Sequence, residues 1–298
     1  IPLRLVGSEM CIRDRKKIGK AGSKVEPALF RQKCRDYAIR QVDGQRRDFV
    51  RLGILADWEN PYLTMQYEVE ANIVRALGKV VENGHLVKGY KPVYWSVIGG
   101  SALAEAEVEY QDKQSYAIDV GYPVMGEAQL ERLQRAFSGT PGEGEIQVLI
   151  WTTTPWTIPS SQAISVGAEL TYALVQYQRC GQPCRLICAR SLLDSVMQRL
   201  AIEDYQTLAE CPGTALEHLV VQHPFYRRDI PLLVGEHVTD DAGTGCVHTA
   251  PDHGMEDFLV ANEYGIGTLN YILDNGLFRD EVEPVSYTHL TLPTTREV

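Results

Sequence analysis

Two imidazoles and three carboxylates lie close together in the stretch GTGCVHTAPDHGMEDF, at residues 243–258. Its leading glycines let the backbone approach a ligand closely, and Pro251 stops any helix that begins before it. An apolar pattern resumes at Phe258, which predicts a helix that begins near Gly254 and carries Asp257 in its first turn. The stretch therefore predicts a strand, a ligand-facing loop and a helix, with His248 and Asp257 aimed at one space. The alternative is a solvated turn.

Hydroxyl groups gather in a second stretch, IQVLIWTTTPWTIP, at residues 146–159. Its first six residues form a nearly continuous apolar run, which is typical of a buried strand. The run ends in Thr152, Thr153 and Thr154, whose hydroxyls can hydrogen-bond a ribose, a carbonyl or a water. Each threonine alone is also an ordinary strand residue. Three in a row, framed by Trp151 and Trp156, favour a binding role.

The peptides WTTTPWTIP and GTGCVHTAPDHG resemble the editing domain of class I aminoacyl-tRNA synthetases, in the isoleucyl branch. The resemblance continues upstream through QVDGQRRDFVRLGILADWENPYLTM and SALAEAEVEY, and it covers residues 16–284. Valyl and leucyl members usually carry Arg after the second threonine of this peptide. Thr154 and Trp156 therefore favour the isoleucyl branch.

The resemblance implies a function, the hydrolysis of valine wrongly attached to tRNA(Ile), and a role for several residues. Asp257 would pair with the α-ammonium group, and His248 would form a wall that rejects isoleucine. Thr152, Thr153 and Thr154 would bind the terminal adenosine and orient the attacking water. Further substrate contacts are expected from Trp151, Trp156, Ser161, Gly245 and His253. Many relatives carry Asn where this chain has Ser161, and the remaining histidines are expected to be structural or exposed.

Neither of the two class I signatures for ATP, His-x-Gly-His and Lys-Met-Ser-Lys-Ser, occurs in this chain. The chain alone is therefore expected to make no aminoacyl-adenylate, whereas the full-length enzyme would use ATP and Mg²⁺. Editing itself is expected to need no cofactor. The expected partners are tRNA(Ile) carrying valine and the remainder of the synthetase chain.

No metal site is predicted. Ser96 and Gly99 stand where some relatives carry a Cys-x-x-Cys zinc half-site. Cys180, Cys184 and Cys188 share a three-residue gap, but period-two alternation spreads them along a strand rather than around an ion.

Composition narrows the classes of partner. The formal net charge of −10 over 298 residues argues against a general basic coat for nucleic acid. A local cluster of Lys and Arg between residues 16 and 51 is a candidate tRNA contact, with a solvated helix face as an equal alternative. Seven scattered cysteines indicate a reducing compartment, and no apolar run reaches the roughly 18 residues of a membrane span. A cytoplasmic location and no membrane partner are expected.

The predicted fold class is α/β: part of a Rossmann-like nucleotide-binding domain at residues 16–102, and a mixed, barrel-like, β-rich editing domain at residues 103–284. The first is expected to hold helices at 28–52 and 68–81 and a strand at 91–97, and a strand or ribbon at 102–110 leads into the second. The second is expected to hold strands at 146–153, 163–166, 172–177, 186–189, 219–221, 230–234 and 246–249, and helices at 128–137, 192–200 and 254–264. Residues 1–15 and 285–298 match nothing around them and are predicted to be non-native tails that pack on nothing.

Other functions remain open at this point. One is a non-catalytic tRNA-binding fragment, and another is the corresponding region of a valyl-type synthetase. A free-standing editing factor is less favoured, because half of a nucleotide-binding domain should not be stable alone.

Overall fold

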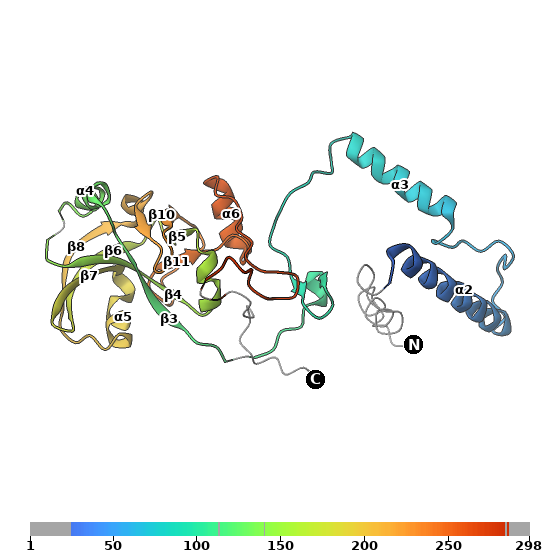
Figure 1. Cartoon of the computed structure of the whole chain (residues 1–298), viewed down its shortest axis with the longest axis horizontal. Helices are drawn as coiled ribbons and strands as arrows, with labels where there is room; N and C mark the ends of the chain where they lie inside the picture. Colours follow the sequence, from blue (N-terminus) through green and yellow to red (C-terminus); the bar gives the residue numbers. More distant parts are fainter. Residues whose placement is uncertain (1–24, 113, 140, 284, 286–298) are drawn as a thin grey trace. The chain divides into compact units, whose positions relative to one another are not determined.

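The computed structural model describes residues 25–112, 114–139, 141–283 and 285 (Figure 1). The chain divides into two compact units, residues 1–89 and 90–298. The predicted tail at residues 1–15 lies outside the described residues, as does the C-terminal tail apart from Val285. No helix in the described ranges is long and apolar enough to cross a bilayer.

Two helices form most of the described part of the first unit: α2 (Pro27–Arg51) and α3 (Tyr67–Glu82). Pro27 suits the first turn of α2, where no intrahelical N–H bond is lost, and Gly44 does not interrupt the helix. Arg35 forms an ion pair with Glu70 at 2.6 Å, which links the two helices. Neither helix has a buried residue, although α3 has a clear apolar stripe.

The Rossmann-like part of the prediction is not confirmed. The described residues of the first unit contain no parallel sheet. The expected strand at 91–97 is confirmed only at β1 (Trp95–Ser96), which pairs antiparallel with β2 (Ser101–Ala102). The expected ribbon at 102–110 is wrong beyond its first residue, since a 3-10 turn, η1 (Glu105–Glu107), follows.

A five-stranded mixed sheet forms the centre of the second unit. Its strand order is β3 (Ile118–Pro123), β4 (Glu145–Thr152), β7 (Gln182–Ala189), β6 (Thr171–Arg179) and β8 (Tyr205–Pro212). β4 and β7 run parallel, and the other neighbours run antiparallel. The apolar run in β4 is buried on both faces, which explains its lack of alternation.

A second, four-stranded sheet packs against the first. Its order is β11 (Cys246–Thr249), β5 (Ala163–Val166), β10 (Asp229–Val234) and β9 (Val220–Gln222). β5 and β10 run parallel, while β11 and β9 pair antiparallel at the two edges. The barrel-like expectation is wrong, since both sheets are open, but the α/β class fits. One hydrophobic core contains buried residues of both sheets.

Three helices and three 3-10 turns connect these strands. The helices are α4 (Glu127–Ala136), α5 (Leu193–Arg199) and α6 (Met255–Glu263), and the turns are η2 (Pro155–Ser160), η3 (Arg190–Leu192) and η4 (Gly213–Leu216). The expected helices and strands between residues 128 and 264 are confirmed, most of them to within one or two residues. β7 begins four residues earlier than expected, and β3 and β8 were not expected at all.

Candidate active site

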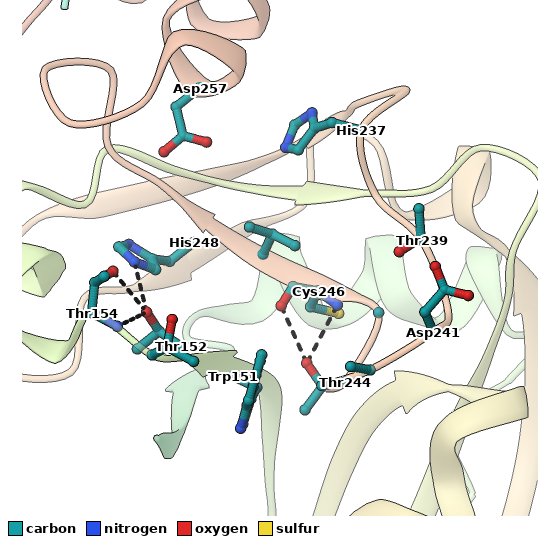
Figure 2. A pocket seen from close by; sticks show the side chains of 15 residues that line it. Trp151, Thr152, Thr154, His237, Thr239, Asp241, Thr244, Cys246, His248 and Asp257 are labelled. Atoms are coloured by element: carbon teal, nitrogen blue, oxygen red, sulfur yellow. Dashed lines mark hydrogen bonds between the residues drawn. The ribbon is translucent and has the colours of Figure 1, made fainter. Parts of the chain in front are cut away.

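A cavity of about 360 Å³ lies where the end of β4 meets the loop before β11 (Figure 2). Pockets of this size suit a small-molecule group such as an aminoacyl moiety. Seven of the residues predicted for the site line the cavity: Trp151, Thr152, Thr153, Thr154, Gly245, His248 and Asp257. The structure thus brings together two segments about a hundred residues apart in the sequence.

The threonines follow the last residues of a buried strand and form a hydrogen-bonded turn. Thr152 closes β4, and its Oγ1 accepts the backbone N–H of Thr154 at 3.0 Å. The two hydroxyl oxygens lie 3.2 Å apart. Pro155 then opens η2, which returns Thr157 so that its hydroxyl donates to the Thr154 carbonyl at 2.8 Å. This turn is fixed by its own bonds.

His248 closes the threonine turn from the opposite segment. It lies on β11 opposite Ile164 of β5, and its Nε2 is 3.4 Å from Thr152 Oγ1 and 3.2 Å from Thr157 Oγ1. Because the Thr157 hydrogen is already donated to a carbonyl, a hydrogen bond between Nε2 and Thr157 requires the ring proton to be on Nε2. Nδ1 is then an acceptor, buried and without a hydrogen-bond partner among the described residues. Burial, aided by His253 and His223, lowers the pKa of His248 to about 4, so the ring is neutral at pH 7.

Asp257 sits in the first turn of α6, as the sequence predicts. Its Oδ2 accepts the backbone N–H of Ala250 at 2.8 Å, which ties the helix start to the end of β11. Burial raises the pKa of this carboxyl, while the Ala250 bond and the nearby His237 oppose the rise. A half-buried carboxylate, one oxygen of which accepts no hydrogen bond from the part of the chain that the structure describes, is suited to bind a cationic group.

The two glycines that frame Thr244 serve backbone geometry and packing. Gly243 and Gly245 have φ angles of +83° and +72°, a region that side chains disfavour. A Cβ on Gly245 would lie 2.4 Å from the Ala189 Cβ, so packing against the end of β7 requires glycine there. The Thr244 carbonyl accepts the Ala189 N–H at 2.8 Å, which holds the loop against that strand.

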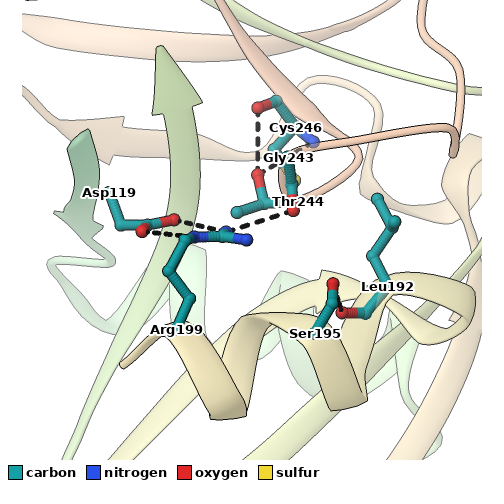
Figure 3. Close-up of polar contacts among 7 residues, drawn as sticks. All are labelled: Asp119, Leu192, Ser195, Arg199, Gly243, Thr244 and Cys246. Atoms are coloured by element: carbon teal, nitrogen blue, oxygen red, sulfur yellow. Dashed lines mark hydrogen bonds and ion pairs between the residues drawn. The ribbon is translucent and has the colours of Figure 1, made fainter. Parts of the chain in front are cut away.

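An ion pair outside the cavity holds the start of the same loop (Figure 3). Arg199, the last residue of α5, donates two bonds of 2.7 Å to the two carboxylate oxygens of Asp119 on β3. Its Nη2 also donates to the Gly243 carbonyl at 3.2 Å. Asp119 is largely buried, with 10% of its side chain exposed. Such a two-pronged pair has a fixed geometry, so it positions the glycine loop relative to the main sheet.

Three residues predicted to contact substrate do not line the cavity. Trp156 lies in η2, and Ser161 is fully buried with its hydroxyl accepting the Tyr122 hydroxyl at 3.3 Å. His253 Nε2 lies 3.2 Å from Ser160 Oγ in η2.

Several lining residues carry no predicted role in the sequence: His237, Thr239, Asp241, Ala242, Thr244, Cys246 and Val247. Most of them belong to the segment that surrounds the glycine loop, so its length was underestimated. His237 was assigned a structural or surface role, because no local pattern marks it. Thr157 also received no role, although it forms a hydrogen bond with His248. It lies in the same threonine-rich stretch, five residues after Thr152, and Pro155 between them indicated a turn that could bring the two threonines together.

The described ranges contain no group of three or more His, Cys, Asp or Glu side chains that could hold a metal ion. Cys184 and Cys188 lie along β7, and Cys180 precedes that strand. The absence of a zinc site in the intact protein stays a prediction.

Residues 6–279 match the family described as tRNA synthetases class I (I, L, M and V). The chain is 60% identical over 276 residues to an isoleucine–tRNA ligase of Teredinibacter turnerae and 57% identical over 275 residues to that of Saccharophagus degradans. Each match covers 92% of this chain but only 29% of the relative.

Among solved structures, the editing domain of the P. knowlesi cytosolic leucyl-tRNA synthetase matches 48% of this chain and 62% of its own, with 14% identity and a TM-score of 0.37. That likeness is too weak to carry an argument. The match to the family model covers far more than half of the sequence, and the chain therefore belongs to the class I tRNA synthetases of the I, L, M and V group.

Proposed function

We propose that this chain is the editing portion of an isoleucyl-tRNA synthetase and hydrolyses the valyl ester of mischarged tRNA(Ile). One observation carries the proposal: the threonine turn and the His248–Asp257 segment, far apart in sequence, line one cavity of aminoacyl size. The isoleucine–tRNA ligases among the relatives support the choice of amino acid. The full set of substrates belongs to a protein of which this chain spans 29%.

Such a site answers a known physical limit. One methylene group in a hydrophobic pocket distinguishes isoleucine from valine by only about 1–3 kcal/mol, and isoleucyl-tRNA synthetase is itself the standard example of that limit. A second site that hydrolyses the smaller ester removes the errors that binding cannot prevent.

The residues suggest how the reaction proceeds. The free oxygen of Asp257 pairs with the α-ammonium group of valine and so places the ester in the cavity. The neutral ring of His248, fixed by two threonine hydroxyls, limits the room for the side chain. The hydroxyls of Thr153 and Thr154 hold the terminal ribose and a water. That water adds to the ester carbonyl, the ribose hydroxyl leaves with a proton, and valine and tRNA(Ile) are released. A reactive ester needs orientation more than a protein nucleophile.

The expected partners of this chain are the tRNA and the remainder of the synthetase, and the expected cellular location is the cytoplasm. Amino-acid activation is expected to belong to the rest of the enzyme. In the first unit, Arg35 pairs with Glu70 and Arg46 with Glu59, so two arginines of the basic cluster are already engaged. ATP and Mg²⁺ would serve adenylate formation in the full-length enzyme. No isoleucine-dependent pyrophosphate exchange is expected from this chain.

The test is deacylation of Val-tRNA(Ile) and Ile-tRNA(Ile) by the 298-residue chain, and by an intact synthetase that carries these residues. Faster hydrolysis of the valyl ester supports the proposal. Binding of tRNA(Ile) without hydrolysis by either protein would instead assign a non-catalytic tRNA-binding role. Preferential hydrolysis of Thr-tRNA(Val) would assign the site to a valyl-type enzyme.

A further inference from the structure

His237 lines the cavity from the loop between β10 and β11, beside a glycine that leaves room for its ring. A Cβ at Gly235 would lie 2.7 Å from His237 Cε1 and 3.0 Å from Nδ1. The ring therefore lies over the Gly235 backbone. Its Nε2 is buried and makes no hydrogen bond with any residue that the structure describes. A buried polar nitrogen without a partner is costly unless a ligand or water completes it.

The Asp257 carboxylate lines the same cavity, and among the described residues it makes no hydrogen bond to this nitrogen. Figure 2 shows the His237 ring and the Asp257 carboxylate turned toward the same part of the cavity. Asp257 Oδ2 is occupied by the Ala250 N–H, and no bond between Asp257 and His237 is present among the described residues. The space between them therefore offers one free carboxylate oxygen and one free ring nitrogen.

An α-ammonium group fits that pair of acceptors. It has three N–H donors in a tetrahedral arrangement, and a single carboxylate oxygen satisfies only one of them. A neutral imidazole with its proton on Nδ1 presents an acceptor at Nε2. We propose that His237 Nε2 is the second acceptor of the substrate's α-ammonium group, acting with Asp257. The proposal rests on the function given above and deepens it. It makes His237 a binding residue that distinguishes aminoacyl from plain acyl esters.

The experiment compares two esters of tRNA(Ile) that differ only in the amino group: the valyl ester and the isovaleryl ester, charged chemically. Three variants are used in the full chain and in the intact synthetase. His237→Phe keeps a ring but removes both nitrogens, His237→Gln restores a neutral acceptor, and Glu236→Gln changes the exposed neighbour as a control.

His237→Phe is expected to lower kcat/KM for the valyl ester at least tenfold and to change that for the isovaleryl ester less than about twofold. His237→Gln is expected to recover part of the loss. Equal losses on both esters would overturn the proposal and indicate a contact with the ester itself or a structural role. No loss on either ester would also overturn it.

A binding measurement separates this proposal from the proposed function. The valyl amide of 3′-amino-3′-deoxyadenosine cannot be hydrolysed at the ester, and its isovaleryl counterpart lacks the amino group. His237→Phe is expected to weaken calorimetric binding of the valyl amide about tenfold and to leave the isovaleryl amide unchanged. If the unaltered proteins bound the valyl amide in this way but hydrolysed no ester, the function would fail and the His237 assignment would stand. If they hydrolysed the valyl ester and His237→Phe had no effect on binding, the proposed function would stand and the His237 assignment would fail. No binding of either amide and no hydrolysis would overturn both.

Discussion

The two walls of the cavity differ in how many of their polar groups are bonded within the protein. On the threonine wall, formed by Thr152, Thr154 and His248 and backed by Thr157, the hydroxyls and the ring Nε2 are bonded to one another. His248 Nδ1, on the same wall, lacks a partner among the described residues. On the acidic wall, formed by His237 and Asp257, the ring Nε2 lacks a hydrogen bond among the described residues. Asp257 engages Oδ2 alone.

This difference indicates a division of labour. A side chain whose bonds are satisfied within the protein keeps its place when a ligand arrives, so the threonine wall can set the size of the cavity. Groups that lack partners gain hydrogen bonds only when a ligand arrives, so the acidic wall can supply binding energy. Changes to the acidic wall should therefore lower the rate for every amino-acid ester, whereas a change to His248 on the threonine wall should alter the choice between esters.

The largest effect is expected from Asp257→Ala. Its loss leaves the α-ammonium group without a charged partner, a bond worth about 1.5–3 kcal/mol, so hydrolysis of Val-tRNA(Ile) should fall on the order of tenfold to a hundredfold. Deacylation kinetics measure it, and Glu256→Ala, a change at the exposed neighbour in the same turn of α6, is the control. Undiminished hydrolysis would remove the anchor and the contrast between the walls.

His248→Ala is expected to change specificity more than rate. The smaller side chain leaves space for the extra methylene of isoleucine, so the ratio of Ile-tRNA(Ile) to Val-tRNA(Ile) hydrolysis should rise by roughly tenfold. The same change also removes the bonds to Thr152 and Thr157.

His248→Phe separates the two contributions, since it keeps the bulk and loses the bonds. If size alone matters, this variant should still reject the isoleucyl ester. Equal losses on both esters for His248→Ala would contradict the wall role and favour a direct part in the chemistry.

Arg199→Ala is expected to have a smaller effect on both esters alike. Arg199 touches the cavity only through the Gly243 carbonyl, so its loss should loosen the glycine loop and lower the rate a few fold. Asp119→Asn should give a similar result, because it weakens the same pair. Arg190→Ala is the control, since Arg190 pairs with the half-exposed Glu210 instead. A change in the preference between the esters would show that the loop belongs to the size filter.

Local sequence patterns were sufficient for much of this site. The apolar run before Thr152 predicts a strand whose end must emerge at a sheet edge, and Pro251 followed by a renewed apolar pattern predicts the start of α6. The secondary structure of both segments could therefore be predicted from their own local sequence. The family resemblance then brought them to one site, which hydrophobic periodicity alone does not do.

Other features depend on pairings between distant segments. His237 reaches the cavity because β10 pairs with β5, which in turn pairs with β11, and no local pattern records those neighbours. β3 is an edge strand interrupted by Gly121, so its periodicity is weak. The expected closure into a barrel failed for the same reason, because whether the last strands pair is decided by the register of distant edges.

The smallest expected effect concerns the protonation of the threonine wall, measured as the dependence of folding stability on pH. The pKa of His248 is about 4 in the folded chain and about 6.5 when unfolded. As the pH falls from 6.5 towards 4, the unfolded chain binds a proton that the folded chain does not, so the free energy of unfolding decreases. For an isolated group this loss reaches at most roughly 3 kcal/mol near pH 4.

His248→Phe should remove the contribution of His248 to the pH dependence of the free energy of unfolding and leave the contributions of the other groups. His223, whose pKa burial also lowers to about 4, still acts in the same direction in that variant. Asp257 acts in the opposite direction, because burial raises its pKa and protonation then favours the folded state. Urea unfolding, monitored by tryptophan fluorescence at pH 7 and pH 5, measures how the free energy of unfolding changes with pH. His85→Phe is the control, because His85 is exposed. The same pH dependence in His248→Phe and the unaltered chain would mean that folding does not lower the pKa of His248, so that the ring on the threonine wall would be protonated in the folded chain at pH 5.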